Sequence, residues 1–154
     1  MNVVLYRIDE RLIHGQIMTA WQGRTGASTV VIVDDMAAQD EFMIEIYRLA
    51  APASIKVDVV GIKDFHQMVS DKNNNTKTIV LFKGPAEALE ALKEGVPVGE
   101  LIVGNVSTTP KRKKYTRYAY LTEEEKDMLD QLQQLGWDVN MQLLPDDTKN
   151  RFEK

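Results

Sequence analysis

The chain has 154 residues and no cysteine, which excludes disulfides, thiol nucleophiles, thiolate metal sites and cysteine-based phosphoryl carriers. Its 19 basic and 23 acidic side chains give a net charge of -4, which argues against a general nucleic-acid surface. No stretch approaches the roughly 18 consecutive apolar residues of a membrane span, and the first residues do not resemble a signal peptide. We therefore expect a cytoplasmic protein.

Apolar, β-branched runs alternate along the chain with patterns of helical spacing. Strands are predicted at 3–8, 29–33, 55–60, 78–82, 100–103, 118–121 and 137–143. Helices are predicted at 16–22, 40–50, 62–69 and 85–92, and from the cap residue Thr122 to Gly136. Glu125 stands three residues after Thr122, which is the spacing of a capping box. Gly23 and Gly26 are expected to end the first helix.

This alternation, with strands that are apolar throughout, predicts an α/β fold in which helices cover both faces of the sheet. The sequence shows no internal repeat, linker or change in composition that would mark a second domain. We therefore expect residues 1–154 to form a single domain.

Polar side chains follow four of the predicted strands. They are Asp9, Arg11 and His14 after the first strand, Asp34 after the second, Lys83 after the fourth and Asn105 after the fifth. Ligands of open parallel sheets bind at the carboxyl ends of the strands. We therefore expect these side chains on one rim of the sheet.

His14 lies in a loop between a strand and a helix, and Gly15 follows it where the backbone must turn sharply or approach a ligand closely. Free N–H groups at the start of the helix favour an anion there, and Arg11 supplies a forked positive charge for phosphate oxygens. Asp9 is a candidate to hold the imidazole in one tautomer. Neutral imidazole is a good nucleophile near pH 7, so phosphoryl transfer to nitrogen is sensible chemistry at this site.

The residues alone leave other roles open. His14 equally fits a capping or packing histidine, and general acid–base catalysis suits the same group of side chains. A metal site is disfavoured because one histidine and scattered acids lack the spacing of zinc ligands. The glycines form no P-loop or dinucleotide-binding pattern. The second histidine, His66, falls within a predicted helix and is expected to be structural.

The stretch 7–16, Arg-Ile-Asp-Glu-Arg-Leu-Ile-His-Gly-Gln, resembles the signature of the IIB component of the mannose/fructose/sorbose/N-acetylgalactosamine family of bacterial sugar phosphotransferase systems. The resemblance covers nearly the whole chain, with further blocks at 31–35, 50–52, 81–83, 95–97, 120–124, 135–139 and 144–145. It implies a mostly parallel sheet of about seven strands with an antiparallel strand at one edge. Family members use a histidine where other IIB families use a cysteine, which agrees with a chain that has none.

The resemblance also implies a function. Such a protein accepts a phosphoryl group from a phosphohistidine of its IIA partner, here on His14, and passes it to a hexose-type sugar that crosses the membrane through the IIC and IID components. This is a protein-phosphohistidine–sugar phosphotransferase that needs no cofactor, metal or nucleic acid. It would associate with the membrane through IIC and IID. A homodimer is left open, and a phosphosugar-binding or regulatory module using the same rim is the alternative.

The resemblance further assigns expected roles to individual residues. Arg11 and Asp9 would support the phosphorylated imidazole of His14. We expect the phosphoryl-binding loop to comprise Leu12, Ile13, Gly15 and Gln16. From their places at the ends of strands, we expect Asp34, Lys83 and Asn105 as possible members of the rim.

The chain departs from the family pattern after the fifth predicted strand. Where many relatives carry two glycines, this chain has Gly104 followed by Asn105. A loop with four consecutive basic residues, 111–114, comes next. This run suggests anion binding, but it is too short to indicate a nucleic-acid site, and a solvated loop face is the expectation.

Overall fold

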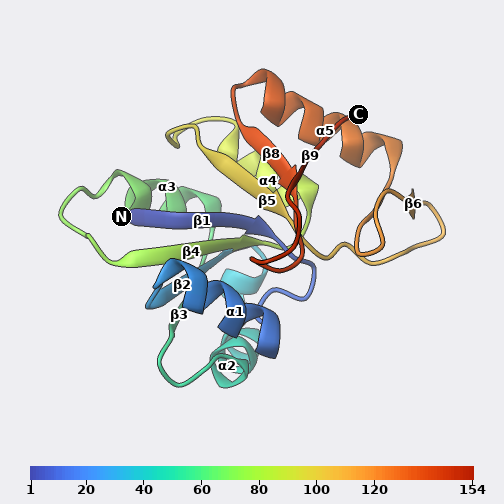
Figure 1. The fold of residues 1–154 in the computed structure, drawn as a ribbon. Coiled ribbons are helices and arrows are strands. Elements are labelled where there is room, and N and C mark those ends of the chain that lie inside the picture. The colour runs from blue at the N-terminus through green and yellow to red at the C-terminus, as the bar shows by residue number, and fades with distance from the viewer.

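The computed structural model describes all residues, 1–154, and Figure 1 shows the arrangement of its elements. The strands are β1 (Asn2–Ile8), β2 (Thr29–Val33), β3 (Lys56–Val60), β4 (Lys77–Phe82), β5 (Glu100–Val103), β6 (Lys113–Lys114), β7 (Tyr120–Leu121), β8 (Asp138–Met141) and β9 (Asn150–Arg151). The helices are α1 (Gly15–Thr25), α2 (Glu41–Ala50), α3 (Ile62–Ser70), α4 (Pro85–Leu92) and α5 (Glu123–Gln134), with a short 3-10 turn, η1 (Ala37–Gln39).

The central sheet has seven strands in the order β3-β2-β4-β1-β5-β8-β9. All neighbouring strands are parallel except β9, which runs antiparallel to β8 at the edge. β1 lies in the middle, between β4 and β5. The carboxyl ends of β1, β2, β4 and β5 therefore meet at one edge of the sheet, and this edge is called the rim below.

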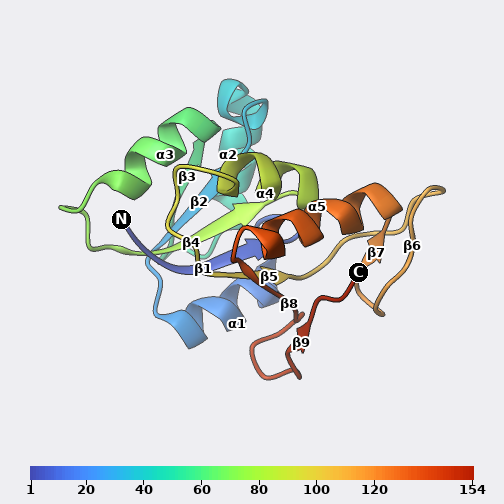
Figure 2. The same ribbon diagram turned by 90° about the horizontal axis from the view of Figure 1, so that it is seen from above.

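Helices cover both faces of the sheet. The chain moves from β1 to β2 to β3 in one direction and then returns, so right-handed crossovers place α1 and α2 on one face and α3, α4 and α5 on the other. Figure 2 shows α1 on one side of the strands and α3, α4 and α5 on the opposite side. Each face has its own core: Met18, Trp21 and Ile32 belong to one cluster of buried residues, and Phe65 and Leu129 to the other.

The predicted fold class is confirmed, including the antiparallel strand at one edge, but the predicted strand at 118–121 does not join the central sheet. The predicted strand at 118–121 lies outside the central sheet, because its residues pair antiparallel with β6 and leave the position beside β5 to β8. The antiparallel edge strand is β9, which is only two residues long and lies where no strand was predicted. So short a strand leaves no alternating pattern to detect.

The predicted helices are present, with shifts at their ends. α1 continues through Gly23 to Thr25, and only Gly26 ends it, in the left-handed conformation at φ 71°. α5 begins with the predicted capping box: the Thr122 hydroxyl accepts from the Glu125 amide at 3.0 Å, and the Glu125 carboxylate accepts from the Thr122 amide at 3.0 Å. None of the helices has the length and apolar character that crossing a membrane requires.

Candidate functional site

His14 is the residue immediately before α1, at the rim where β1 ends. Its backbone is extended, with φ -137° and ψ 111°, and its carbonyl accepts the first helical hydrogen bond from the Met18 amide at 3.0 Å. The imidazole is exposed and makes no capping hydrogen bond with the helix. The ring is therefore presented to solvent at the positive end of the helix dipole.

The sharp bend before His14 occurs at Leu12 and not at Gly15. Leu12 has a positive φ of 56°, and its amide donates to the Asp9 carbonyl at 2.8 Å to close a tight turn. The side chains of Leu12 and Ile13 are buried, at 4% and 6% exposed, in the core that α1 covers. Burial of these two side chains holds the turn in a conformation that leucine rarely adopts.

Gly15 is the first residue of α1 and its φ is not positive, so the sharp turn expected there is absent. A Cβ atom placed on Gly15 would meet nothing within 4 Å. Gln16, the next residue, is exposed. The structure therefore leaves open space beside His14, over the free backbone N–H groups of the helix start.

Asp9 is directed at two arginines. The carboxylate is only 1% exposed. Its Oδ1 accepts from the Arg11 amide at 3.0 Å and lies 3.5 Å from Arg11 Nε, and its Oδ2 lies 3.5 Å from Arg7 Nη2. Asp9 thus holds Arg11 beside the His14 loop, whereas the sequence suggested that it would hold the imidazole itself. The Arg11 side chain remains 36% exposed, so its charge is accessible to an incoming anion.

Arg7 is a structural centre of the site that the sequence did not reveal. Its side chain is 2% exposed, and it donates from Nη1 to the Gln142 carbonyl at 2.9 Å and from Nη2 to the Leu143 carbonyl at 2.8 Å. Its guanidinium also stacks 5.1 Å from the ring centroid of Trp21, whose indole Nε1 donates to the same Leu143 carbonyl at 3.0 Å. Burial lowers the pKa of Arg7 to about 10, which still leaves the group charged at neutral pH. The feature of the sequence that could have indicated this role is the presence of an arginine within an otherwise apolar strand.

A second hydrogen-bond network connects the His14 loop to the segment after β5 and to α5. The Glu10 carboxylate accepts from the Ser107 amide at 2.9 Å and from Arg112 Nη1 at 3.1 Å. Arg112 also donates from Nε and Nη2 to Glu125, at 2.9 and 2.8 Å, in a bidentate pair. Arg112 is therefore a half-buried bridge between the His14 loop and α5, and the solvated loop face expected for residues 111–114 does not include it.

The other predicted rim residues lie at the ends of their strands. Asn105 is half-buried, and its carbonyl accepts from the Glu10 amide at 2.8 Å, directly beside the site. Lys83 is exposed at the end of β4, the other neighbour of β1. Asp34 lies one strand farther away and caps the turn after β2, since its Oδ1 accepts from the amides of Met36 and Ala37. The structure thus brings Lys83 and Asn105 next to β1 and places Asp34 farther out.

His66 is held between two helices. Its Nε2 lies 2.8 Å from the Ala91 carbonyl of α4, and its ring packs against Phe65 at 5.8 Å between centroids. No group of three or more histidine, aspartate or glutamate side chains is arranged to hold a metal ion. Among the imidazoles, only that of His14 is exposed at the rim beside an arginine.

This arrangement suits transfer of an anionic group to nitrogen. The His14 ring is free to act as a nucleophile, Arg11 offers charged donors, and the start of α1 offers uncommitted backbone N–H groups. Phosphoryl transfer requires mainly such positioning and charge stabilisation.

Comparison with known proteins gives a consistent picture over almost the whole chain. The model of the family described as "PTS system sorbose subfamily IIB component" matches residues 3–154. The chain is 31% identical to the PTS system fructose-specific EIIB component of Bacillus subtilis (strain 168), over 99% of this chain and 94% of that protein. It is 29% identical to the PTS system sorbose-specific EIIB component of Klebsiella pneumoniae, over 96% of this chain and 90% of that protein.

Two solved structures also superpose on this chain over almost its whole length. The crystal structure of manxB from Thermoanaerobacter tengcongensis superposes with a TM-score of 0.88 at 37% identity, covering 97% of this chain and 92% of the other. The IIBSor domain of the sorbose permease from Klebsiella pneumoniae superposes with a TM-score of 0.89 at 28% identity, with the same coverage.

Proposed function

Because the chain belongs to the sorbose subfamily of phosphotransferase-system IIB components, we propose that His14 is the residue on which it carries the phosphoryl group. IIB components are phosphotransferases of sugar uptake, and this chain is one of them. The single observation that carries the assignment to His14 is its position: an exposed imidazole before α1, beside Arg11, at the centre of the rim.

In the proposed first step, a ring nitrogen of His14 attacks the phosphorus of a phosphohistidine on the IIA protein. The P–N bond to the donor breaks as the P–N bond to His14 forms, and the donor imidazole takes up the proton that the His14 ring gives up. In the second step a sugar hydroxyl oxygen attacks the phosphorus. The P–N bond to His14 breaks, and the hydroxyl proton passes to the imidazole nitrogen that the phosphorus leaves.

The neighbours of His14 would act mainly through position and charge. Arg11, held by Asp9, would donate to the phosphoryl oxygens, and the N–H groups at Gly15 and Gln16 would bind the same oxygens. The buried side chains of Leu12 and Ile13 would fix the loop against the core. Lys83 and Asn105, at the ends of the two strands that flank β1, would contact the partner protein or the sugar.

The partners follow from the same proposal. The donor is a IIA protein or domain, and the acceptor is a sugar held by membrane components of the IIC and IID types. The chain would act in the cytoplasm as one domain and reach the membrane through those components. Relatives carry names for fructose, sorbose and N-acetylgalactosamine, so a hexose-type sugar is the proposed substrate class.

Phosphate mapping tests this function. The chain is incubated with phosphorylated IIA protein, and the acid-labile phosphate is located by mass spectrometry under neutral conditions. We expect one label, on His14, and none in a His14→Ala variant. His66→Gln is the matched control and should be labelled like the unchanged chain. A label at another residue, or none at all, would contradict the proposal.

A further inference from the structure

The segment between β5 and α5 is unusually basic for a chain with a net negative charge. Residues 104–122 contain five basic side chains and no acidic one. Residues 111–121, which include β6 and β7, are called the basic hairpin below. Its lysines, Lys111, Lys113 and Lys114, are all exposed.

These three lysines are close together in the sequence, and none of them has an ion-pair partner. Lys93, Lys126 and Lys149 each pair with a glutamate, whereas the lysines of the basic hairpin form no ion pair within the chain. Of the three acidic residues at the start of α5, Glu123 pairs with Lys126 and Glu125 pairs with Arg112, which leaves only the exposed Glu124 unpaired. The three unpaired lysines outnumber this one free carboxylate, so the hairpin and the start of α5 present a net positive charge.

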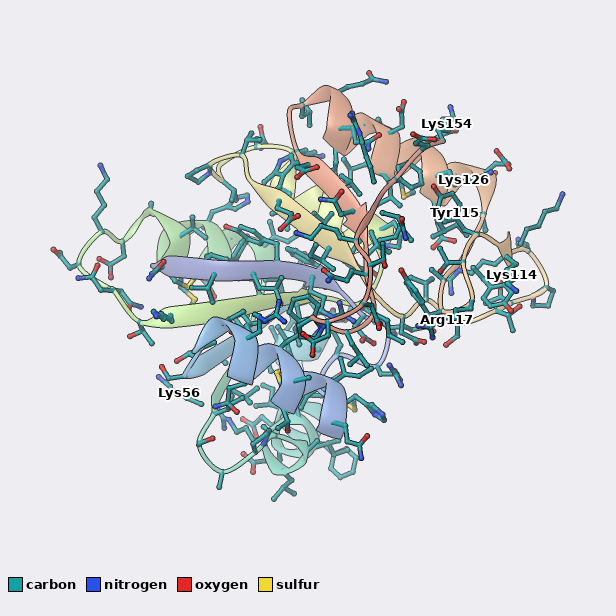
Figure 3. All side chains as sticks on the ribbon, viewed as in Figure 1. Lys56, Lys114, Tyr115, Arg117, Lys126 and Lys154 are labelled. Atoms are coloured by element: carbon teal, nitrogen blue, oxygen red, sulfur yellow. The ribbon has the colours of Figure 1, made fainter.

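The basic hairpin projects from the rim that carries His14. Residues after β5 leave the rim, and a bridge between Val106 and Ala119 holds the base of the hairpin. Figures 1 and 2 show it extending beyond the body of the molecule on the side where β1 ends and α1 begins. In Figure 3, Lys114 and Arg117 lie at this end, and Lys56 lies far from them.

Two side chains of the hairpin attach it to the body of the domain. Arg112 binds Glu10 of the His14 loop as well as Glu125. The Tyr115 hydroxyl donates to the Glu153 carbonyl at 2.9 Å and accepts from the amide of the same residue. These contacts connect the backbone that carries the lysines to the His14 loop and to α5.

We propose that the basic hairpin binds anionic lipid headgroups and so orients the rim toward the membrane. This inference rests on the proposed function, because transfer to a sugar in a membrane component brings the rim of this chain to the bilayer. Lysines near an anionic leaflet are attracted to it within about a Debye length. The cytoplasmic loops of membrane proteins are themselves rich in lysine and arginine. Lipid phosphates are therefore better partners for the hairpin than those loops.

Vesicle co-sedimentation tests the proposal with the unphosphorylated chain and no partner protein. Vesicles of phosphatidylcholine with phosphatidylglycerol are compared with vesicles of phosphatidylcholine alone. The triple variant Lys111→Gln, Lys113→Gln, Lys114→Gln is compared with a control of equal charge change, Lys56→Gln, Lys72→Gln, Lys77→Gln, at the opposite end of the strands. Circular dichroism verifies that both triple variants fold.

We expect binding to the anionic vesicles only, weakened roughly tenfold or more in the hairpin variant and little changed in the control. High salt should release the unchanged chain from the vesicles. Absence of binding, or equal loss in both triple variants, would overturn the proposal. The proposal would also be overturned if the hairpin variant bound lipid as well as the unchanged chain but was phosphorylated more slowly by the IIA protein. That result would assign the hairpin to binding of the IIA protein. Because the sedimentation uses the unphosphorylated chain and does not depend on phosphoryl transfer to His14, its failure is distinct from a failure of the His14 mapping.

Discussion

Gly104 lies directly against the guanidinium of Arg7. A Cβ atom on Gly104 would come within 2.2 Å of Arg7 Nη2 and 2.4 Å of Cζ, distances that no real contact allows. The φ of Gly104 is not positive, so the glycine is present for space and not for an unusual backbone conformation. The chain keeps a glycine here because the buried arginine occupies the volume of a side chain.

Replacement of Gly104 by alanine should therefore destabilise the fold. We expect Gly104→Ala to lower the free energy of unfolding by about 1–3 kcal/mol, since the new methyl group displaces the Arg7 side chain from two carbonyls. Urea denaturation measures the change. Gly99→Ala is the control, because its Cβ would meet only Trp137 at 3.9 Å. Equal stability of the two variants would show that Arg7 can move aside freely.

Asp9→Asn should affect folding more than chemistry. The substitution removes the negative charge that faces Arg7 in a buried setting, and loss of one partner of a buried ion pair costs about 3–5 kcal/mol. Thermal and urea denaturation would show this loss, and Asp58→Asn, whose pair with Lys56 is more exposed, would show little. A variant that is stable yet slow to accept phosphate would contradict this expectation and would assign Asp9 a role in the transfer, through Arg11 or through the imidazole.

In contrast to Asp9→Asn, Arg11→Ala should slow phosphoryl transfer more than it destabilises the fold. The Arg11 side chain is 36% exposed, so its removal leaves no buried cavity, but a charged donor beside His14 is lost. We expect phosphorylation of His14 to slow by about 100-fold while the midpoint of urea unfolding changes little. Stopped-flow or rapid-quench labelling measures the rate. Arg48→Ala, on the exposed face of α2, is the matched control. Parallel losses of stability and rate in Arg11→Ala would assign Arg11 to the fold.

Leu12 tests the strained turn before His14. Leu12→Met and Leu12→Ile both retain a buried apolar side chain of similar size, but isoleucine is branched at Cβ and tolerates the left-handed conformation poorly. We expect Leu12→Ile to be less stable than Leu12→Met by about 1–3 kcal/mol. Chemical denaturation of both proteins measures the difference. Indistinguishable stabilities would mean that the turn can relax to a negative φ.

The network around Arg112 predicts a dependence on pH. Burial raises the pKa of Glu125, but hydrogen bonds from Arg112 and Thr122 outweigh it and place the pKa below the ordinary value of 4.5. Because the pKa is lower in the folded state, the carboxylate stabilises the fold above pH 4.5, and this stability is lost as the pH falls through the folded pKa. Glu125→Gln should flatten the decline in stability in that acidic range. Exposed Glu124→Gln should leave it unchanged, and identical profiles for the two variants would refute the role of the network.

Local patterns predicted most of the fold. Apolar runs such as 29–33 and 100–103 became strands with the same limits, and the capping box at Thr122 formed as expected. These features depend on neighbours in sequence. β9 escaped prediction because a two-residue strand has no period, and its pairing with β8 is set by tertiary contacts.

Only those parts of the candidate site that depend on local sequence patterns could be predicted. The loop, the exposed histidine and the rim could be inferred from the ends of strands. The partners of Asp9 and Arg7 could not, because the carbonyls that bind Arg7 lie 135 and 136 residues away in sequence. The positive φ of Leu12 was also hidden, since glycine at position 15 was the more obvious residue for a sharp turn.

The long reach of Arg7 has a consequence for biosynthesis. The arginine is translated near the start of the chain, yet the carbonyls that hold it belong to Gln142 and Leu143. During synthesis, domains generally fold as units. The charged guanidinium of Arg7 therefore lacks these hydrogen-bond partners until almost the entire polypeptide has been synthesised. The candidate site is thus completed late in synthesis, and a nascent chain stalled before residue 142 would lack the two carbonyls that hold Arg7.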